Sequence, residues 1–568
     1  MLCISVECRI DCGVLFLHEQ RKPNFLKGAA ILAATGIFVK IIGAIYKIPI
    51  INVLGDEGAG YFQVTYNVYA LILAISTAGV PVALSRLVSS ARARGDTALV
   101  KRYFSVAMPV FIIVGIVVMS AMFFFAEELA EFMNSSLAAP GIRVLAPAVF
   151  FVCMIAVYRG YAQGFENMIP TAMSQIVEVI SKALFGIIVA FLLARLGYQS
   201  QYVSAGAITG VTIGLGLCIP LMIWYKRKLD HRIKRVEEDE STDPHEIQEL
   251  PSPMRVFLKF MKVSIPITLG ASFMSVMVVI DTSVVLGRLQ SALLLSEQEA
   301  VEQFGVLTKG LTIYNLPPSL IVPLAISIIP AIAAAVARKN KDEASVIMQS
   351  SVKLTNLISM PACAGIVVLA GPILKALYYD PRQSPETVAM MTTILAILGV
   401  ASYFVCFQHL SIAILQANGY ERIALMTFPA GALVKITLSY VLVANPDIGI
   451  LGSPIGTLAC FTLITALNVI FIIVKVKERM KIISGIIKPL VCALLMAAAA
   501  FFTYEGVYWF GSGLLGTGRM AVVVYLAIAI FVGVLVYAAL IVITRAITKE
   551  DLSYVPKGEK LAKLMRVS

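Results

Sequence analysis

Residues 29–50 of this 568-residue chain read AAILAATGIFVKIIGAIYKIPI, an apolar stretch long enough to cross a bilayer as one helix. Thirteen further apolar stretches of similar length follow it, separated by polar breaks. The chain is 59% hydrophobic and only 14% charged, compared with about 45–50% and about 25% in soluble domains. Because no soluble fold buries that much apolar surface, the sequence predicts an all-α polytopic membrane protein and excludes secreted, disordered and ordinary cytosolic classes.

The predicted membrane helices number about fourteen. They cover residues 29–50, 61–90, 103–126, 143–166, 170–194, 203–225, 257–287, 309–336, 347–370, 386–415, 420–443, 450–475, 484–504 and 520–545. The corresponding domains are an N-terminal segment (1–28), a first lobe of six helices (29–225), a linker (226–256), a second lobe of six helices (257–477), two appended helices (478–545) and a tail (546–568).

The placement of Lys and Arg predicts the orientation. With the N-terminus inside, the cytoplasmic connections hold 32 of these residues and the opposite connections hold 7. Both termini are therefore expected in the cytoplasm, with the net charge of +12 facing anionic lipid rather than nucleic acid. The first 28 residues do not resemble a signal peptide. We expect residues 2–16 to be dispensable, with initiation near Val14 or Leu17.

The two predicted lobes resemble each other in sequence. AQGFE at 162–166 recurs loosely as QANGYE at 416–421, and a lysine follows the glutamine by 19 residues in each copy, Lys182 and Lys435. Six predicted helices separate the copies, and an even number preserves the direction of the chain. The lobes are therefore expected to be a parallel repeat related by an axis along the membrane normal.

Several ionisable residues lie inside the predicted helices, where each costs about 2.5–3.5 kcal/mol unless it faces a partner or a cavity. Lys40 is halfway along the first helix. It shares one helix face with Gly36, Gly43 and Lys47, and the glycines leave space for a ligand. The candidate cavity cations are Lys40, Lys47, Arg86, Arg159, Lys182 and Lys435.

Structural roles remain open for several of these charges. Snorkelling toward the membrane surface suits Lys47 and Arg86, and Lys309 is expected at the interface. Lys182 has Glu178 one turn before it, which predicts either an ion pair or a cavity role. Asp281, the other candidate cavity acid, either pairs with a lysine or binds a coupling cation.

The excess of cations over acids in the membrane predicts an anionic substrate, such as a pyrophosphate or a carboxylate. No nucleophile elbow, phosphate-binding loop or zinc-protease motif occurs, so we expect no enzymatic activity. The spacing of the nine cysteines and four histidines predicts neither a zinc site nor a disulfide framework.

Particular motifs resemble a known family. They are FLKGA at 25–29, NVLGDEGAGY at 52–61, AGVPVALSR at 78–86, RGYAQG at 159–164 and NLPP at 315–318. Over residues 24–545 the chain resembles the stage V sporulation protein B group. This is the polysaccharide-biosynthesis branch of the multidrug/oligosaccharidyl-lipid/polysaccharide (MOP) exporter superfamily, which is close to the MurJ-like lipid II flippases.

The resemblance implies alternating access in a two-lobed transporter that moves undecaprenyl-pyrophosphate-linked cell-wall oligosaccharides to the outer leaflet. Lys40 matches the basic first-helix position of the family. Asp281 and Thr457 match a sodium site found in some members, but Lys435 and Ser439 depart from it, which leaves H⁺ and Na⁺ open as coupling ions. Expected partners are the lipid-linked substrate, membrane lipids and cell-wall synthesis proteins. The alternatives are a multidrug antiporter and a non-transporting scaffold.

Overall fold

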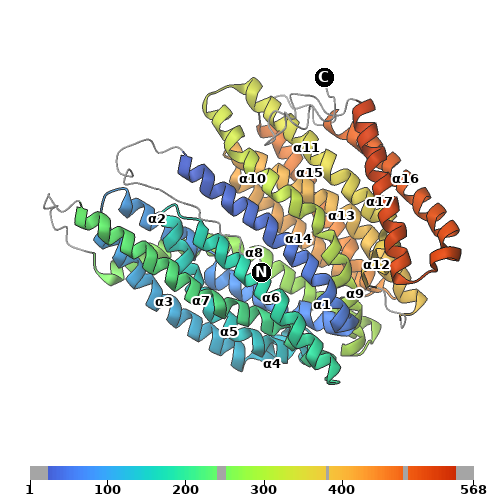
Figure 1. Cartoon of the computed structure of the whole chain (residues 1–568), viewed down its shortest axis with the longest axis horizontal. Coiled ribbons are helices and arrows are strands. Elements are labelled where there is room, and N and C mark those ends of the chain that lie inside the picture. Colours follow the sequence, from blue (N-terminus) through green and yellow to red (C-terminus); the bar gives the residue numbers. More distant parts are fainter. Residues whose placement is uncertain (1–22, 240–250, 379–382, 477–483, 545–568) are drawn as a thin grey trace, which may run out of the picture.

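The computed structural model describes residues 23–239, 251–378, 383–476 and 484–544. Every regular element within these ranges is a helix, which confirms the predicted all-α class (Figure 1). The predicted terminal segments up to residue 22 and after residue 544, including the expected dispensable stretch, lie outside the described residues.

The helices are arranged as two lobes and an appended pair. The first lobe comprises α1 (Pro23–Thr77), α2 (Val80–Arg92), α3 (Thr97–Phe124), α4 (Ala126–Phe132), η1 (Ser136–Ala138), α5 (Ala139–Gly164), α6 (Ile169–Arg195) and α7 (Ser200–Asp239). The second comprises α8 (Pro253–Leu293), α9 (Glu297–Tyr314), α10 (Leu316–Ala337), α11 (Lys341–Val368), α12 (Ala370–Tyr378), α13 (Pro385–Ala417), α14 (Glu421–Val443), η2 (Gly449–Leu451) and α15 (Gly452–Lys475). The appended helices are α16 (Ser484–Leu515) and α17 (Arg519–Ile543).

Thirteen helical stretches of the described chain are long and apolar enough to cross a membrane. The first of them, Ala34–Arg92, has 59 residues and contains both of the first two predicted helices. Gly55 interrupts it with φ 70° and ψ −171°, a conformation that glycine adopts without strain. α1 is therefore two helices joined at Gly55, which reconciles thirteen stretches with about fourteen predicted crossings.

Polar caps explain where several helices begin. Asp96, Ser252, Ser296, Asn340 and Ser384 each accept a hydrogen bond from the backbone N–H three residues later. Such a cap satisfies one of the amides that the first turn of a helix leaves without a partner. Capping hydrogen bonds thus fix the first residues of these helices, in addition to the change in hydropathy.

The two lobes repeat the same order of helices. A helix of 28 residues followed by a short one occurs as α3–α4 and again as α11–α12. Lys182 on α6 and Lys435 on α14 occupy matching positions, because each helix follows the repeated AQGFE-like turn. α16 and α17 lie outside the repeat and pack on α11 and α12 (Figure 1). The region predicted as a linker is partly helical, since α7 continues to Asp239.

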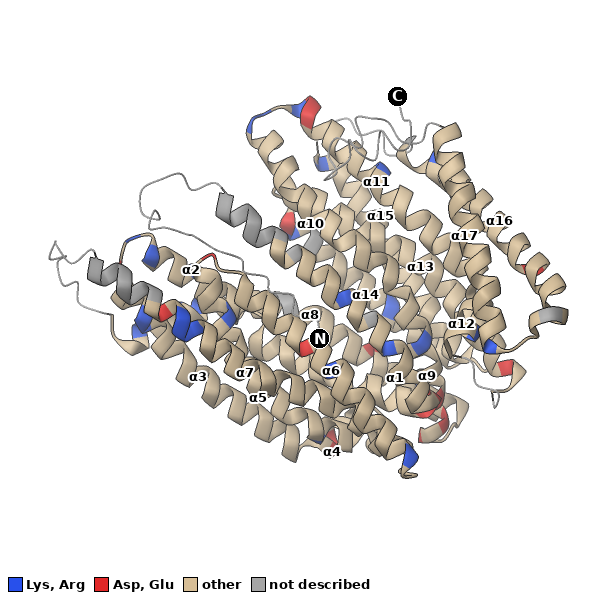
Figure 2. Ribbon diagram, in the orientation of Figure 1, with Lys and Arg blue, Asp and Glu red and all other residues tan. Residues whose placement is uncertain are grey.

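The ends of the helices define two ends of the molecule, here called the Asp56 end and the Lys226 end. α1 reaches the Asp56 end at Gly55, and α17 starts there, because Leu377 accepts hydrogen bonds from both Asn52 and Arg519. The described chain therefore begins and finishes at the Lys226 end. Figure 2 shows Lys and Arg gathered where α2, α3 and α7 approach that end, while most of the ribbon is uncharged.

Polar contacts join the lobes at the Asp56 end. Asn134 donates to the Ser283 carbonyl at 3.0 Å, and the Leu137 N–H donates to the Glu297 carboxylate at 2.9 Å. Glu297 also accepts a hydrogen bond from Ser136. Each of these bonds connects a residue of the first lobe with one of the second, so the lobes are closed against each other at this end.

Two glycines allow the backbones of the lobes to touch along this seam. A Cβ atom on Gly305 would lie 1.7 Å from the Asp56 carbonyl oxygen, and one on Gly60 would lie 2.2 Å from that of Val301. Neither obstacle is a flexible side chain, so any larger residue requires the helices to separate. The closed seam depends on the absence of these two side chains.

We predict that Gly305→Ala opens or weakens the seam at the Asp56 end. Overpacking of this kind costs about 1–3 kcal/mol, and here the backbone of α1 must move. A thermal unfolding curve of the purified protein should shift to lower temperature. Gly506→Ala in α16 is the matched control, because a Cβ atom there would meet nothing within 4 Å. Equal transition temperatures for the two variants would contradict the prediction.

Candidate functional site

One face of α1 is open along two turns. Cβ atoms built on Gly36 and Gly43 would meet no atom within 4 Å, and Lys40 between them is exposed. Lys40 is an electrostatic neighbour of His409 on α13, which belongs to the other lobe. Figure 1 shows this first half of α1 as the blue helix running between the lobes. The face predicted to leave space for a ligand is therefore uncovered in the structure, with Lys40 close to a residue of the second lobe.

Lys182 reaches this helix from α6. Its Nζ lies 5.1 Å from the ring centroid of Tyr46 and 4.8 Å from that of Tyr66, and it donates to the Tyr66 hydroxyl at 3.5 Å. The ammonium is thus stabilised by two aromatic faces rather than by a carboxylate. Because the two tyrosines come from the two halves of α1, Lys182 also holds those halves together.

Lys47 lies on the same side of α1, one residue after Tyr46. Its ammonium donates to the Gln63 Oε1 at 3.1 Å, and its side chain is only partly buried. Within the described residues, no carboxylate lies within ion-pair distance of Lys40, Lys47 or Lys182. Three positive charges that make no ion pair with a described carboxylate therefore lie on or beside this part of α1.

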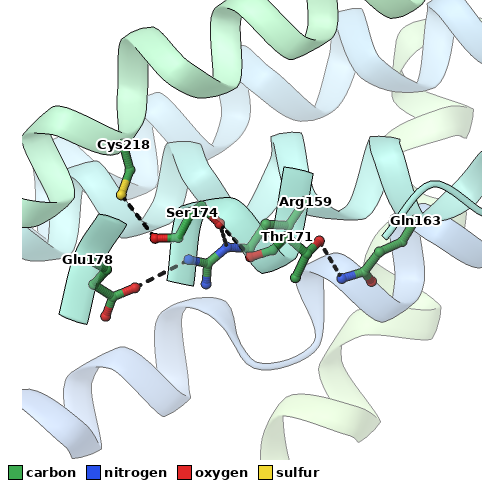
Figure 3. A network of polar contacts seen from close by, with 6 residues as sticks. All are labelled: Arg159, Gln163, Thr171, Ser174, Glu178 and Cys218. Carbon is green, nitrogen blue, oxygen red and sulfur yellow. Dashed lines mark hydrogen bonds and ion pairs between the residues drawn. The ribbon is translucent and has the colours of Figure 1, made fainter. Parts of the chain in front are cut away.

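Arg159, another predicted cavity cation, is neutralised. Its guanidinium lies 3.2 Å from the Glu178 carboxylate and donates to the Ser174 hydroxyl at 2.9 Å (Figure 3). Glu178 therefore pairs with Arg159 of the neighbouring helix, and not with Lys182 on its own helix. The same network ties Gln163 to Thr171 and Cys218 to the Ser174 carbonyl, so it fastens α5, α6 and α7 together.

Lys435 is also neutralised. Its Nζ lies 2.9 Å from Asp281 Oδ2, and the Ser439 hydroxyl donates to Asp281 Oδ1 at 2.9 Å. Asp281 is 8% exposed, and Lys435 lines a small, mainly apolar cavity of about 80 Å³ between α8, α14 and α15. Of the two alternatives for Asp281, the structure shows the lysine pair. Arg86 is exposed on α2 and makes no ion pair in the described part of the chain.

One ion pair at the seam was not predicted from the sequence. Lys309, expected at the interface, is 4% exposed and pairs with Asp56 of the other lobe. Gln383 donates to Asp56 Oδ2 at 2.7 Å, which adds a second bond from the second lobe to the same carboxylate. Asp56 lies in the polar connection between the first two predicted helices. The acidic, glycine-rich sequence of this connection is the feature that could have indicated such a contact.

A polar cavity of about 500 Å³ adjoins this pair at the seam. Its lining includes Asp56 and Glu57 from the first lobe and Glu302 and Gln383 from the second. Burial, followed by the negative charges of Asp56 and other nearby acids, raises the pKa of Glu302. The Asp56 end of the seam is therefore acidic, whereas the open face of α1 is basic.

The chemistry of the open face follows from its charges. Three ammonium groups without acidic partners attract phosphates or carboxylates and repel cations. In the described part of the chain, no group of three or more His, Cys, Asp and Glu side chains is placed to hold a metal ion. The arrangement therefore suits an anionic ligand that binds through charge-assisted hydrogen bonds.

The sequence matches family models and known proteins. The family model described as polysaccharide biosynthesis protein matches residues 25–336, and the MatE model matches residues 266–441. Among Bacillus subtilis (strain 168) proteins, stage V sporulation protein B is 25% identical over 94% of this chain and 98% of its own length. The uncharacterized membrane protein YabM is 27% identical over 95% and 96%, and the lipid II flippase MurJ is 25% identical over 77% and 81%.

Solved structures share the fold. The lipid II flippase MurJ in an inward closed conformation superposes with a TM-score of 0.64 at 16% identity, covering 90% of this chain and 98% of that one. An inward-facing multidrug resistance MATE transporter superposes with a TM-score of 0.61 at 16% identity, covering 80% and 98%. Both are multi-pass helical membrane proteins. This chain is a multi-pass membrane protein that belongs to the polysaccharide biosynthesis protein family.

Proposed function

We propose that this chain is a flippase that moves an anionic, polyprenyl-pyrophosphate-linked cell-wall oligosaccharide across the bacterial plasma membrane. The observation that carries this proposal is the open face of α1, where Lys40, Lys47 and Lys182 have no acidic partner among the described residues. A pyrophosphate supplies the missing negative charge and accepts hydrogen bonds from several ammonium groups at once. The relatives named as flippases support a lipid-linked substrate for this chain.

The direction of transport follows from the predicted orientation. With the Lys226 end in the cytoplasm, as the 32 to 7 distribution of Lys and Arg favours, the closed seam is external. A lipid-linked substrate then enters between the lobes from the inner leaflet and leaves after the seam opens. This alternating access needs no covalent chemistry, so we propose that the protein is not an enzyme.

A multidrug antiporter is the main alternative, and the acids of the membrane helices argue against it. A cationic drug requires a carboxylate that is not already neutralised. Glu178 is paired with Arg159, and Asp281 is paired with Lys435. The side chains left without an opposite charge in the described membrane helices include Lys40, Lys47 and Lys182, and each of them repels such a drug.

We predict that Lys40→Ala weakens substrate binding without impairing the fold. Loss of one charge-assisted contact costs about 1.5–3 kcal/mol, which is roughly ten- to a hundredfold in affinity. Lys40→Arg keeps the charge and should retain most of the binding. The measurements are the affinity of the purified protein for undecaprenyl pyrophosphate and the flipping of a fluorescent lipid-linked oligosaccharide in proteoliposomes.

Lys228→Ala is the matched control for this prediction, because Lys228 is exposed over Trp224 on α7 and lies outside the open face. A Lys40→Ala protein that binds and flips normally would contradict the proposed site. Depletion of the protein in its host, followed by identification of the polyprenyl-linked intermediate that accumulates, would identify the cargo.

We further propose that transport does not require sodium. The family resemblance implies a sodium site in some members, and Asp281 matches its acidic position on the seventh predicted helix. Here the Lys435 ammonium already neutralises Asp281. Flipping in proteoliposomes should therefore proceed at a similar rate when Na⁺ is replaced by K⁺. A strict dependence on Na⁺ would contradict this proposal.

The Asp281–Lys435 pair also leads to a stability prediction. Removal of one partner from a buried pair costs about 3–5 kcal/mol, because the other charge is left without compensation. Lys435→Ala should therefore lower the thermal transition, and the added change Asp281→Asn should restore most of the loss. If the double variant is no more stable than Lys435→Ala alone, the two charges are not energetically coupled.

A further inference from the structure

A row of four polar side chains connects the cation site to the second lobe. The Lys47 ammonium donates to Gln63 Oε1 at 3.1 Å, and Gln63 Nε2 donates to Asn67 Oδ1 at 2.7 Å. Asn67 Nδ2 then donates to Thr282 Oγ1 at 2.9 Å, which lies on α8 of the other lobe. The row therefore begins at the open face of α1 and ends at a contact between the lobes.

The direction of every hydrogen bond in this row follows from its first member. An ammonium group only donates, so Gln63 must accept with its oxygen and can donate with its nitrogen. Asn67 therefore accepts with its oxygen, and its nitrogen donates to the Thr282 hydroxyl. Thr282 completes the row by donating to the Val278 carbonyl at 2.8 Å. Loss of the Lys47 ammonium therefore leaves Gln63 Oε1 without its donor, and the direction of the Gln63 and Asn67 amides is no longer fixed.

Burial prevents water from replacing the contact between the lobes. Asn67 is 6% exposed and Thr282 is 2% exposed. A buried amide that loses its partner is destabilised, because no solvent molecule takes its place. The bond between Asn67 and Thr282 therefore favours the arrangement in which α1 and α8 stay together.

The second lobe is anchored at the same place by neighbouring residues. Ser283 donates to the Phe132 carbonyl at 2.6 Å, and Gln290 donates to the Asn134 carbonyl at 2.6 Å. Asp281, one residue before Thr282, holds Lys435 in its ion pair. The row from Lys47 therefore ends within the stretch of α8 that closes the seam at the Asp56 end.

We propose that Asn67 is a positioning residue through which Lys47 keeps the seam closed while the cation site is empty. This inference rests on the proposed function, because the group that releases the row is an anionic phosphate. When a phosphate draws the Lys47 ammonium away from Gln63, Gln63 loses its donor and the amides of the row are no longer fixed in direction. The bond to Thr282 weakens, and the closed seam becomes less stable relative to the open one.

This arrangement gives the ligand a preference for one conformation. A ligand shifts an equilibrium only by its difference in affinity for the two states. In the closed state the bond from Asn67 to Thr282 fixes the Gln63 oxygen toward Lys47, and the ligand competes with that oxygen. In the open state Asn67 has lost Thr282, so the Gln63 amide is free to turn away from Lys47. An anionic substrate that enters from the cytoplasm therefore promotes opening toward the outside, the order of events that export requires.

The test measures closure of the seam directly. Ser136→Cys and Glu297→Cys place two thiols at side chains that are hydrogen-bonded across the lobes. The six cysteines within the described ranges are buried, and Cys3, Cys8 and Cys12 are replaced by Ser. The initial rate of cross-linking by a short bifunctional thiol reagent then reports how much of the protein has a closed seam.

Thr282→Val removes the acceptor with little change in shape and should lower this rate at least twofold. Lys47→Met, which removes the first donor, should lower it similarly. The matched control is Thr65→Val, because the Thr65 hydroxyl is also buried but has no hydrogen-bond partner among the described residues. Cross-linking at the control rate in either Thr282→Val or Lys47→Met would overturn the proposal.

Addition of undecaprenyl pyrophosphate distinguishes a failure of this proposal from a failure of the proposed function. The compound should lower the cross-linking rate of the Thr65→Val protein and have a much smaller effect on Thr282→Val, in which the row is already broken. An equal response of the two proteins would overturn the role of Asn67 but leave the proposed substrate intact. Failure of the compound to bind any variant would overturn the proposed substrate, and with it the release of the row by phosphate.

Discussion

The cost of a charge without a partner inside a bilayer is the constraint on which this structure depends. That cost is about 2.5–3.5 kcal/mol per group on the insertion scale, and the described charges meet it in three ways. Arg159 and Lys435 are paired with carboxylates from neighbouring helices. Lys182 lies against two aromatic rings, and Lys40 is exposed on the open face of α1. The first solution fastens helices together, and the last leaves a positive charge accessible.

The internal repeat allows the surroundings of two equivalent lysines to be compared. Lys182 and Lys435 occupy matching positions in the two lobes, yet they have different surroundings. α8 supplies Asp281 to Lys435, whereas the matching first helix of the chain supplies Tyr46 to Lys182. A carboxylate neutralises the charge completely, but an aromatic face stabilises it and leaves its net charge in place. The two copies of the same architecture thus differ in their charge, and the first lobe keeps the positive charge that the second neutralises.

Hydropathy and composition were sufficient to predict the helical class, the approximate number of crossings and the repeat, because each depends on local sequence. The open face of α1 was also predictable, since the spacing of Gly36, Lys40, Gly43 and Lys47 is a property of one helix. Which carboxylate each cation pairs with could not be predicted from the sequence. Glu178 pairs with Arg159 on another helix rather than with Lys182 four residues away, and this choice is set by how α5 and α6 pack.

The pair between Lys309 and Asp56 was beyond sequence reasoning for a similar cause. Its members are far apart in the chain, and Asp56 lies in a connection that hydropathy places outside the membrane helices. Only the approach of the two lobes, permitted by Gly60 and Gly305, brings that connection against α9. The same applies to the row from Lys47 to Thr282, which no periodicity in one segment could reveal.

The length of α7 has a mechanical consequence. Its 40 residues correspond to about 60 Å, roughly twice the thickness of the hydrocarbon core of a bilayer. About half of the helix therefore lies beyond the hydrocarbon core as a continuation of the first lobe. Each degree by which that lobe tilts about the far end of α7 displaces the tip by about 1 Å over this length. The helix acts as a lever that converts a small rotation within the membrane into a much larger movement in the aqueous phase.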